Sequence, residues 1–273
     1  HEAVNEGVVR AHREGIVTSA SLASCGRAFA DAVLRFRSCP ELDLGVHLTL
    51  VEECPVSSVD RIPSLVDRDG KMPGSAAVFA LRWLTGLIRE RDVRRELEAQ
   101  MERVVDSGIR PTHLDSHQHV HCLPGIWAIA LDLARRYGVP YVRIPAFESI
   151  WADARTPGWV ALRAGVNVLA RVHRLTPMRS VRHSDDLRGC SYSGHMTTSR
   201  LLEILDSLQP GLTEVMVHPA FPSVDLRRQY WGWEGFDWGS ELNALTDPRV
   251  LSRCRRGDFV VTSFAGHQGS RRL

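Results

Sequence analysis

The sequence predicts an α/β fold in which short parallel strands alternate with amphipathic helices. Short β-branched segments recur along the chain, a segment with helical periodicity follows most of them, and polar side chains gather where the strands end. With 273 residues the chain is long for one domain but normal for a β/α barrel, which has about 250. We therefore expect a single domain over residues 1–273, folded as a distorted β/α barrel.

The predicted strands are short and rich in Val, Ile and Leu, as strands buried in a parallel sheet are. They cover residues 16–23, 42–50, 111–115, 141–145, 214–219 and 259–262. The chain opens directly into a helical pattern with His1 instead of Met, whereas a parallel sheet normally begins with a strand. We therefore expect the first strand of the barrel to be missing from this sequence.

The predicted helices carry apolar residues on one face, and residues 92–107 show this most clearly. Val93, Leu97, Met101 and Val104 share one side of that segment, and charged residues occupy the other. The helices cover residues 1–15, 27–37, 76–88, 92–107, 126–137, 151–181, 198–208 and 240–250. Three connections are notable: a Pro- and Gly-rich loop at 52–74, a small-residue turn at 189–194 and an aromatic loop at 221–238.

Composition excludes several classes of protein. The chain is 44% hydrophobic and 24% charged with a net charge of +2, and no basic block long enough to bind nucleic acid is present. Its six cysteines are scattered without a CxxC pair, which is typical of reduced thiols in the cytoplasm. No run of about 18 apolar residues predicts a membrane span.

Residues 151–182 form a basic stretch with few acidic side chains. Its cations are Arg163, Arg171, Arg174, Arg179 and Arg182, and valines and leucines give it an apolar side. Such a face is either simply solvated, or it meets the anionic surface of the inner membrane or a lipid-linked substrate. Both interpretations stay open at the level of the sequence, as does the formation of a homodimer.

The segment Pro111–Pro124, PTHLDSHQHVHCLP, places His113, Asp115, His117, His119 and His121 within nine residues. On an extended segment these odd positions share one face. If the strand ends near Asp115, the later histidines lie on a loop or a first helical turn, where His117 and His121 share a side. Either geometry concentrates imidazole and carboxylate groups and predicts a metal site or an acid–base site.

Further polar residues fall at the ends of other predicted strands. His47, Arg143 and His218 each lie near the carboxyl end of a strand, as Asp115 does. Barrel enzymes place their chemistry at this end of the sheet. The alternative for His47, which stands between Val46 and Leu48, is a core histidine with a single hydrogen bond.

At these residues the sequence resembles the YdjC-like carbohydrate deacetylase family. The matching segments are EGIVTSASL at 14–22, DLGVHLTL at 43–50, THLDSHQHVH at 112–121 and VHPA at 217–220. The aromatic loop followed by ELNALTDPRV looks most like the branch associated with hopanoid biosynthesis. The resemblance implies a deacetylase-type barrel that removes the N-acetyl group from an amino sugar, and for this branch from an N-acetylglucosaminyl hopanoid lipid.

The resemblance also implies a divalent metal ion, with Mg²⁺ favoured and Zn²⁺ as the alternative. Carried over by motif, His47 and His117 are metal ligands. The family's third ligand is an aspartate in an N-terminal strand reading like NADDFGLS, which the sequence lacks, so we expect a truncated chain. Asp185 and Asp186 lie far along the chain in a predicted polar loop, and we do not take them as replacements.

The expected chemistry assigns a role to each remaining residue. His218 is the acid near the leaving nitrogen, Asp115 orients a histidine, and Arg143 fixes the sugar or stabilises the oxyanion. Stacking surfaces for the substrate are expected from Tyr192, Trp231 and Trp233.

Two rival functions fit part of the same pattern. A metal-dependent phosphoesterase would use His113, His119 and His121 for additional metal ions. A degenerate barrel that binds a glycolipid without turnover would explain the absent aspartate.

Overall fold

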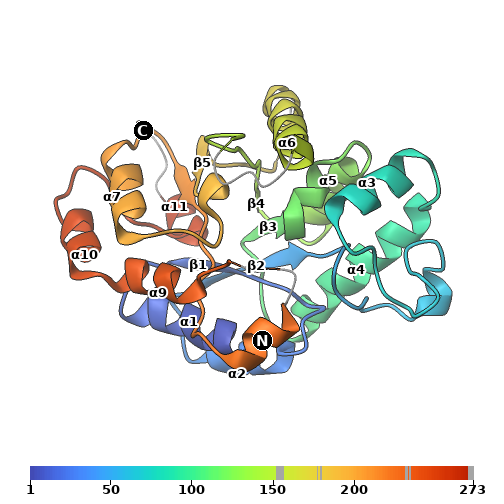
Figure 1. The fold of residues 1–273 in the computed structure, drawn as a ribbon, viewed down its shortest axis with the longest axis horizontal. Coiled ribbons are helices and arrows are strands. Elements are labelled where there is room, and N and C mark those ends of the chain that lie inside the picture. The colour runs from blue at the N-terminus through green and yellow to red at the C-terminus, as the bar shows by residue number, and fades with distance from the viewer. Residues whose placement is uncertain (152–156, 177, 179, 231–232, 234, 270–273) are drawn as a thin grey trace.

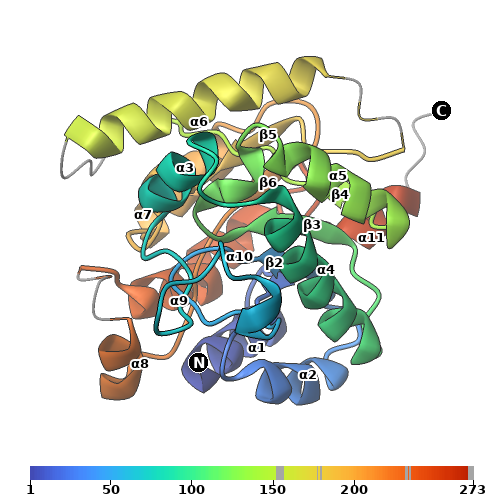
Figure 2. The same ribbon diagram turned by 90° about the vertical axis from the view of Figure 1, so that its right-hand side faces the viewer.

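The computed structural model describes residues 1–151, 157–176, 178, 180–230, 233 and 235–269. Short strands lie at the centre of the molecule, and helices surround them (Figures 1 and 2). This arrangement confirms the α/β class that the sequence predicts.

A four-stranded parallel sheet forms the first part of the core. It contains β1 (Ser19–Leu22), β2 (Asp43–Leu48), β3 (His113–Ser116) and β4 (Tyr141–Val142) in that spatial order. The register aligns His47 of β2 with Asp115 of β3. Since side chains alternate across a strand, aligned residues on neighbouring strands point to the same face. The sheet thus sets an imidazole beside a carboxylate.

A second, two-stranded parallel sheet contains β5 (Asp186–Arg188) and β6 (Thr213–Val215). An isolated bridge between Tyr141 and Arg182 extends the edge of the first sheet. Within the described ranges, no strand ladder closes the two sheets into a ring. The observed fold is thus a distorted, open version of the expected barrel.

The helices follow the sequence periodicity closely in most places. The α-helices are α1 (Glu2–Arg13), α2 (Phe29–Arg37), α3 (Ala76–Leu84), α4 (Glu90–Asp106), α5 (Ile126–Arg136), α6 (Pro157–Leu175), α7 (Thr198–Asp206), α8 (Val224–Gln229), α9 (Trp238–Thr246), α10 (Pro248–Cys254) and α11 (Phe264–Gly269). Three short 3₁₀ segments are η1 (Val59–Arg61), η2 (His117–Cys122) and η3 (Cys190–Tyr192).

Four sequence predictions about elements were wrong. Residues 259–262 belong to no ladder, whereas Asp186 starts strand β5 instead of lying in a loop. The aromatic loop contains α8, whose first turn is capped by the Ser223 side chain. The predicted helix 240–250 is two helices, because Asp247 caps α10 and Pro248 occupies its first turn.

Helix α6 is shorter than predicted, and its arginines do not form one solvated face. Arg163 is buried, with its guanidinium 5.2 Å from the ring centroid of Phe147. Arg174 donates to the carbonyl oxygens of Ser184 and Asp185. Arg171 and Arg182 are exposed, and Arg179 lies outside the described residues.

Two hydrophobic clusters support these elements. The larger cluster packs β1–β4 against α2, α4 and α5, with Leu97, Leu114 and Leu133 fully buried. The smaller cluster joins α1, α7, α9 and α10 through residues such as Leu201 and Leu245. Burying each such leucine stabilises the fold by about 1.5–3 kcal/mol relative to an exposed one. Of the helices that the structure describes, none combines the length and apolar character needed to cross a bilayer.

Candidate active site

A cavity of about 1540 Å³ extends through the centre of the fold, from the segments before β1 and β6 to the carboxyl ends of the strands. Four of the residues that the sequence singled out line it together with Asp115: His47, His117, Arg143 and His218. Their placement confirms the expectation that distant segments deliver polar groups to one end of the sheet.

His47 and Asp115 form the centre of the site. The Nδ1 atom of His47 lies 2.8 Å from Oδ1 of Asp115. Asp115 is buried, and burial alone would raise its pKa, but the nearby Arg143 guanidinium and His47 outweigh it. The pKa of Asp115 is therefore held well below its ordinary value, and the carboxylate stays charged. His47 is thus an oriented site residue, not an isolated core histidine.

Arg143 connects the two sheets. Its guanidinium pairs with Asp115 on β3, and its Nε donates to Oε1 of Glu214 on β6 at 2.8 Å. Two carboxylates thus share one buried cation. Burial alone would lower the pKa of Arg143, but the charges of Asp115 and Glu214 outweigh it, so the pKa is raised. Because these bonds occupy the guanidinium, its main role in this geometry is to fix the two carboxylates.

His117 lies beside His47 and is held by a carboxylate of its own. Its Nε2 atom lies 2.9 Å from Oε2 of Glu52, and the two histidine ring centroids are 5.7 Å apart. Gln118 donates from Nε2 to the other oxygen of Glu52 at 2.7 Å. Each site histidine thus has one ring nitrogen fixed by a carboxylate, as metal-binding histidines typically do.

The backbone around His117 adopts an unusual conformation. Among the described residues, the non-glycine positions with positive φ are Glu52 (65°), Gln118 (49°) and His119 (57°). The left-handed region costs an L-residue about 1–2 kcal/mol. All three residues line the cavity, so the strain is concentrated where His117 is positioned.

His218 follows β6 and rests against a buried carboxylate. Its backbone N–H donates to Oε2 of Glu241 on α9, and its Nδ1 lies 3.9 Å from the same oxygen. Gly194 donates its N–H to Oε1 of Glu241 at 2.6 Å. Desolvation, followed by the nearby Arg143 cation, lowers the pKa of His218, so this ring is neutral at neutral pH. Burial raises the pKa of Glu241 to about 7, against the backbone N–H groups that favour its charged form.

Of the other histidines of the 111–124 segment, His113 and His121 are buried and His119 is half-buried, and all three are neutral. Burial lowers the pKa of both His113 and His121 to about 4, and it lowers that of His119 as well. His113 contacts Ser21 Oγ at 3.0 Å, and His121 contacts Ser116 Oγ and the carbonyl of Arg143. The prediction that His117 and His121 share a side was wrong, since η2 changes direction at Gln118 and His119.

Aromatic side chains form one wall of the cavity. Trp233 lies 5.6 Å from His117 between ring centroids, and Phe236 and Trp238 also line the space. Tyr192 is not part of this wall: its ring packs under Arg200, 4.9 Å from the guanidinium, and against the smaller cluster. Trp231 lies outside the described residues.

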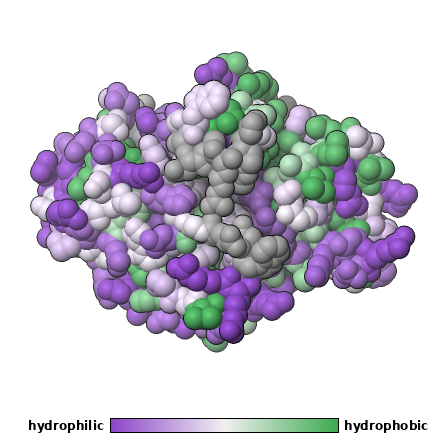
Figure 3. Space-filling model, viewed as in Figure 1, coloured by the Kyte–Doolittle hydropathy of each residue, from purple (hydrophilic) through white to green (hydrophobic). Residues whose placement is uncertain are grey.

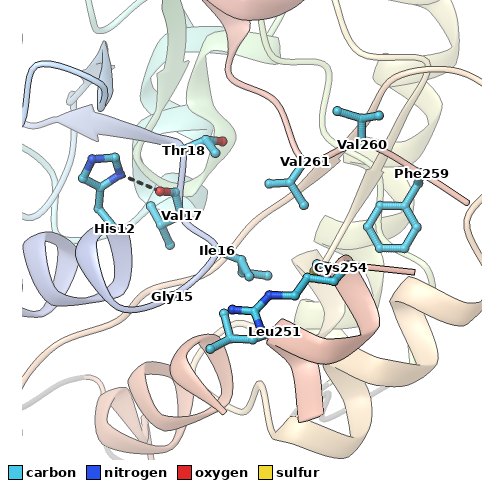
Figure 4. Close-up of a pocket in the computed structure, with 11 residues that line it drawn as sticks. His12, Gly15, Ile16, Val17, Thr18, Leu251, Cys254, Phe259, Val260 and Val261 are labelled. Carbon is cyan, nitrogen blue, oxygen red and sulfur yellow. Dashed lines mark hydrogen bonds between the residues drawn. The ribbon is translucent and has the colours of Figure 1, made fainter. Parts of the chain in front are cut away.

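A smaller pocket of about 520 Å³ adjoins the cavity (Figure 4). Its wall is largely apolar, with Ile16, Val17 and Leu251 among its residues. His12 reaches it from α1, but its Nδ1 is 2.8 Å from the carbonyl oxygen of Val17. The pocket gathers no set of groups that would carry out a reaction.

The donor chemistry of the main cavity suits two ligands of a divalent ion. His47 and His117 each have one ring nitrogen engaged by a carboxylate, which leaves Nε2 of His47 and Nδ1 of His117 as donors. Over the described part of the chain, no group of three His, Cys, Asp or Glu side chains is placed to hold an ion. Of the additional ligands that the rival phosphoesterase would use, His113 and His119 line the cavity and His121 does not, and within the described ranges none of the three belongs to a group that could hold an ion.

Three carboxylates at the site were not predicted from the sequence: Glu52, Glu214 and Glu241. Glu52 follows the segment DLGVHLTL by two residues, and this proximity to His47 was the one available signal. Glu214 is the middle residue of the short strand β6, and Glu241 lies in an ordinary helical pattern. Only the tertiary fold brings these two to Arg143 and His218.

A parallel α/β fold with imidazole, carboxylate and guanidinium groups at the strand ends defines an enzyme class with its active site at this edge. Within that class, the chain belongs to the YdjC-like protein family, whose model matches residues 1–256. The family predicted from the sequence motifs is therefore confirmed.

Similar proteins cover nearly the whole chain. A carbohydrate deacetylase from Geobacillus stearothermophilus is 33% identical over 267 residues, which cover 95% of this chain and 90% of the relative. A chitooligosaccharide deacetylase from Enterobacter sp. (strain 638) is 30% identical over 272 residues, covering 95% and 92%. A solved structure from Enterococcus faecalis V583, assigned by name to cellobiose-phosphate cleavage, has a TM-score of 0.75 at 26% identity and covers 96% and 92%.

Proposed function

We propose that this protein is a divalent-metal-dependent hydrolase that removes the N-acetyl group from an amino sugar. Membership of the YdjC-like family and the deacetylase relatives support hydrolytic deacetylation of a carbohydrate. The observation that carries the metal-dependent part is the pair His47 and His117, each fixed by its own carboxylate and facing one cavity.

His47 and His117 would hold the ion through Nε2 and Nδ1 respectively. A bound divalent ion polarises the acetyl carbonyl and lowers the pKa of a coordinated water. We propose Mg²⁺ first and Zn²⁺ as the alternative. With Nδ1 of His47 donating to Asp115, the lone pair of the ring lies on Nε2, so Asp115 selects the tautomer that binds a cation.

His218 handles the proton that hydrolysis must deliver to the leaving amine. Its ring is neutral in the free enzyme because its surroundings lower its pKa. A neutral imidazole first accepts a proton released as water attacks the amide, and then donates it to the sugar nitrogen. Glu241 fixes the backbone of His218 and lies near Nδ1, so that it keeps the ring in place.

The finer substrate in our proposal is an acetylated sugar carried on an apolar group, such as an N-acetylglucosaminyl hopanoid. The wall formed by Trp233, Phe236 and Trp238 supports this part of the proposal, because aromatic faces pack against both sugar rings and apolar chains. The cavity volume of about 1540 Å³ also leaves room for more than a single sugar ring.

The proposal is tested by two separate measurements. Acetate release is followed with N,N′-diacetylchitobiose and with an N-acetylglucosaminyl hopanoid, and His218→Gln is expected to lower kcat by about 10²–10⁴-fold. Metal content per chain is measured by elemental analysis, and the double substitution His47→Ala/His117→Ala is expected to abolish it.

The two measurements fail in different ways. Unchanged metal content in the double variant removes His47 and His117 as ligands. Retained turnover in His218→Gln, at unchanged metal content, removes His218 as the proton donor.

A further inference from the structure

Two helices beside the cavity expose large apolar side chains to solvent. On α3, Leu81 and Leu84 are each 66% exposed, and on α6, Val168, Val172 and Leu175 are 59%, 52% and 85% exposed. We call these five residues the α3–α6 face. Figure 3 shows hydrophobic residues gathered over α6 and α3, at the top and upper right of the view. Large apolar side chains exposed together on two helices that both pack against η2 are typical of a surface that contacts a partner.

The α3–α6 face borders the candidate active site. Both helices pack against η2, the segment that begins at His117. Ala77 of α3 and Leu162 and Val166 of α6 line the cavity itself. Figure 2 shows α6 along the outside of the molecule, with α3 beneath it. A partner bound on this face would therefore lie next to the cavity entrance.

The charge on these two helices is of one sign. Neither AAVFALRWL of α3 nor PGWVALRAGVNVLARVHRL of α6 contains Asp or Glu, although the chain has 32 acidic residues. Among their charged side chains, that of Arg171 is exposed to solvent beside Val172. A helix with an apolar exposed side and only cationic charges fits the interface of a bilayer with anionic lipids.

We propose that the α3–α6 face docks on an anionic bilayer surface and places the cavity entrance at the lipid headgroups. The apolar side chains insert at the boundary between headgroups and acyl chains, and the exposed Arg171 pairs with an anionic headgroup. The consequence for the substrate, that the acetylated sugar is presented on a membrane lipid, rests on the proposed function. The docking itself depends only on the surface.

Vesicle sedimentation of the full chain tests the docking. Vesicles of phosphatidylcholine alone are compared with vesicles that also contain about one quarter phosphatidylglycerol. The wild type is expected to bind the anionic vesicles preferentially, and Leu81→Glu/Val172→Glu to bind at least about tenfold more weakly. Leu34→Glu is the matched control, because Leu34 is also 66% exposed but lies on α2, far from α6 in Figure 2.

Three results would overturn the docking. These are no binding of the wild type to anionic vesicles, equal losses in Leu34→Glu and in the double variant, or a wild-type dimer by light scattering that the double variant abolishes. The last result would assign the face to a second copy of the chain. Thermal unfolding monitored by circular dichroism confirms that each variant is folded.

A failure of the proposed function gives a different pattern. If the wild type binds anionic vesicles but releases no acetate from either sugar substrate, the docking stands and the deacetylase assignment fails. If acetate release from soluble diacetylchitobiose is the same in all variants while turnover of the vesicle-borne glycolipid falls only in the double variant, both are supported.

Discussion

Glu241 is a fully buried carboxylate that accepts hydrogen bonds from the backbone N–H groups of His218, Gly194 and Met196. Such groups stabilise the anion, but the surrounding apolar helix–helix contacts disfavour it more strongly. The result is a pKa of about 7, compared with an ordinary value of 4.5. This residue therefore changes charge in the folded protein near neutral pH, directly behind the proposed proton donor.

The raised pKa of Glu241 predicts a specific dependence of stability on pH. A group with a raised folded-state pKa contributes its stability fully below the unfolded value and loses it as pH rises through the folded value. The free energy of unfolding of the wild type should therefore fall relative to Glu241→Gln by about 3 kcal/mol between pH 4.5 and 7. Urea denaturation of both proteins at several pH values measures this difference.

A constant difference between the two proteins across that pH range would show that Glu241 titrates normally. Asp237→Asn, at the N-cap of α9, removes a charge that contributes to the raised pKa of Glu241, so in this variant the loss of stability should begin at a lower pH.

Individual site residues were predictable where the motif and the strand end coincide. His47, Asp115, His117, Arg143 and His218 were found because each stands at or just after the carboxyl end of a buried strand. Tyr192 was misplaced since a tyrosine in a small-residue turn has no pattern that indicates which way its ring points. Glu241 was missed because a carboxylate in an amphipathic helix is predicted to be exposed, and only the tertiary structure shows that it is buried.

At the scale of the element, η2 shows how a short segment positions the site. Its residues Gln118 and His119 adopt positive φ, so the chain is kinked directly after His117. The Gln118 side chain compensates by accepting from the Ala76 N–H at the start of α3 and by donating to Glu52. One glutamine thus joins the strained turn to the helix at the cavity rim.

Two substitutions at Gln118 separate backbone strain from side-chain bonding. Gln118→Ala and Gln118→Gly both remove the bonds to Ala76 and Glu52, but only glycine adopts a φ of 49° without strain. Gln118→Gly should therefore be more stable than Gln118→Ala by about 1 kcal/mol, with both less stable than the wild type. Equal unfolding free energies for the two variants would show that this turn is not strained.

Most helices and the inner strands were predictable because their apolar periodicity is regular. The failures lie where local chemistry overrides periodicity. Pro248 and the Asp247 cap divide one apolar run into α9 and α10. The segment 259–262 has strand-like composition but finds no partner strand among the described residues. The left-handed turn at Gln118 and His119 contains no glycine, which is the residue that would have indicated positive φ in the sequence.

At the scale of the whole molecule, the candidate site is assembled from two separately packed parts. His47 and Asp115 belong to the sheet supported by the larger hydrophobic cluster. His218 and Glu241 are positioned by α9 and by the smaller cluster. The ion pairs of Arg143 with Asp115 and Glu214 form a buried polar link between the two sheets.

This division predicts two groups of amide protons in native-state hydrogen exchange. Backbone amides of β2, β3 and α4 should exchange as one group, and those of α7, α9 and α10 as a second, less protected group. The substitution Arg143→Met should speed exchange mainly in the second group, because it leaves Glu214 without its cation. Uniform acceleration throughout the chain would indicate a single cooperative unit.

The guanidinium of Arg143 also has a consequence for evolution of the fold. It pairs with one carboxylate from each sheet. Exchanging Asp115 or Glu214 for a neutral residue would therefore change the balance of charge around the buried guanidinium and the remaining carboxylate. The three positions should therefore vary together or remain unchanged, even though Glu214 stands 71 residues away from Arg143 along the chain and lies outside every recognised motif.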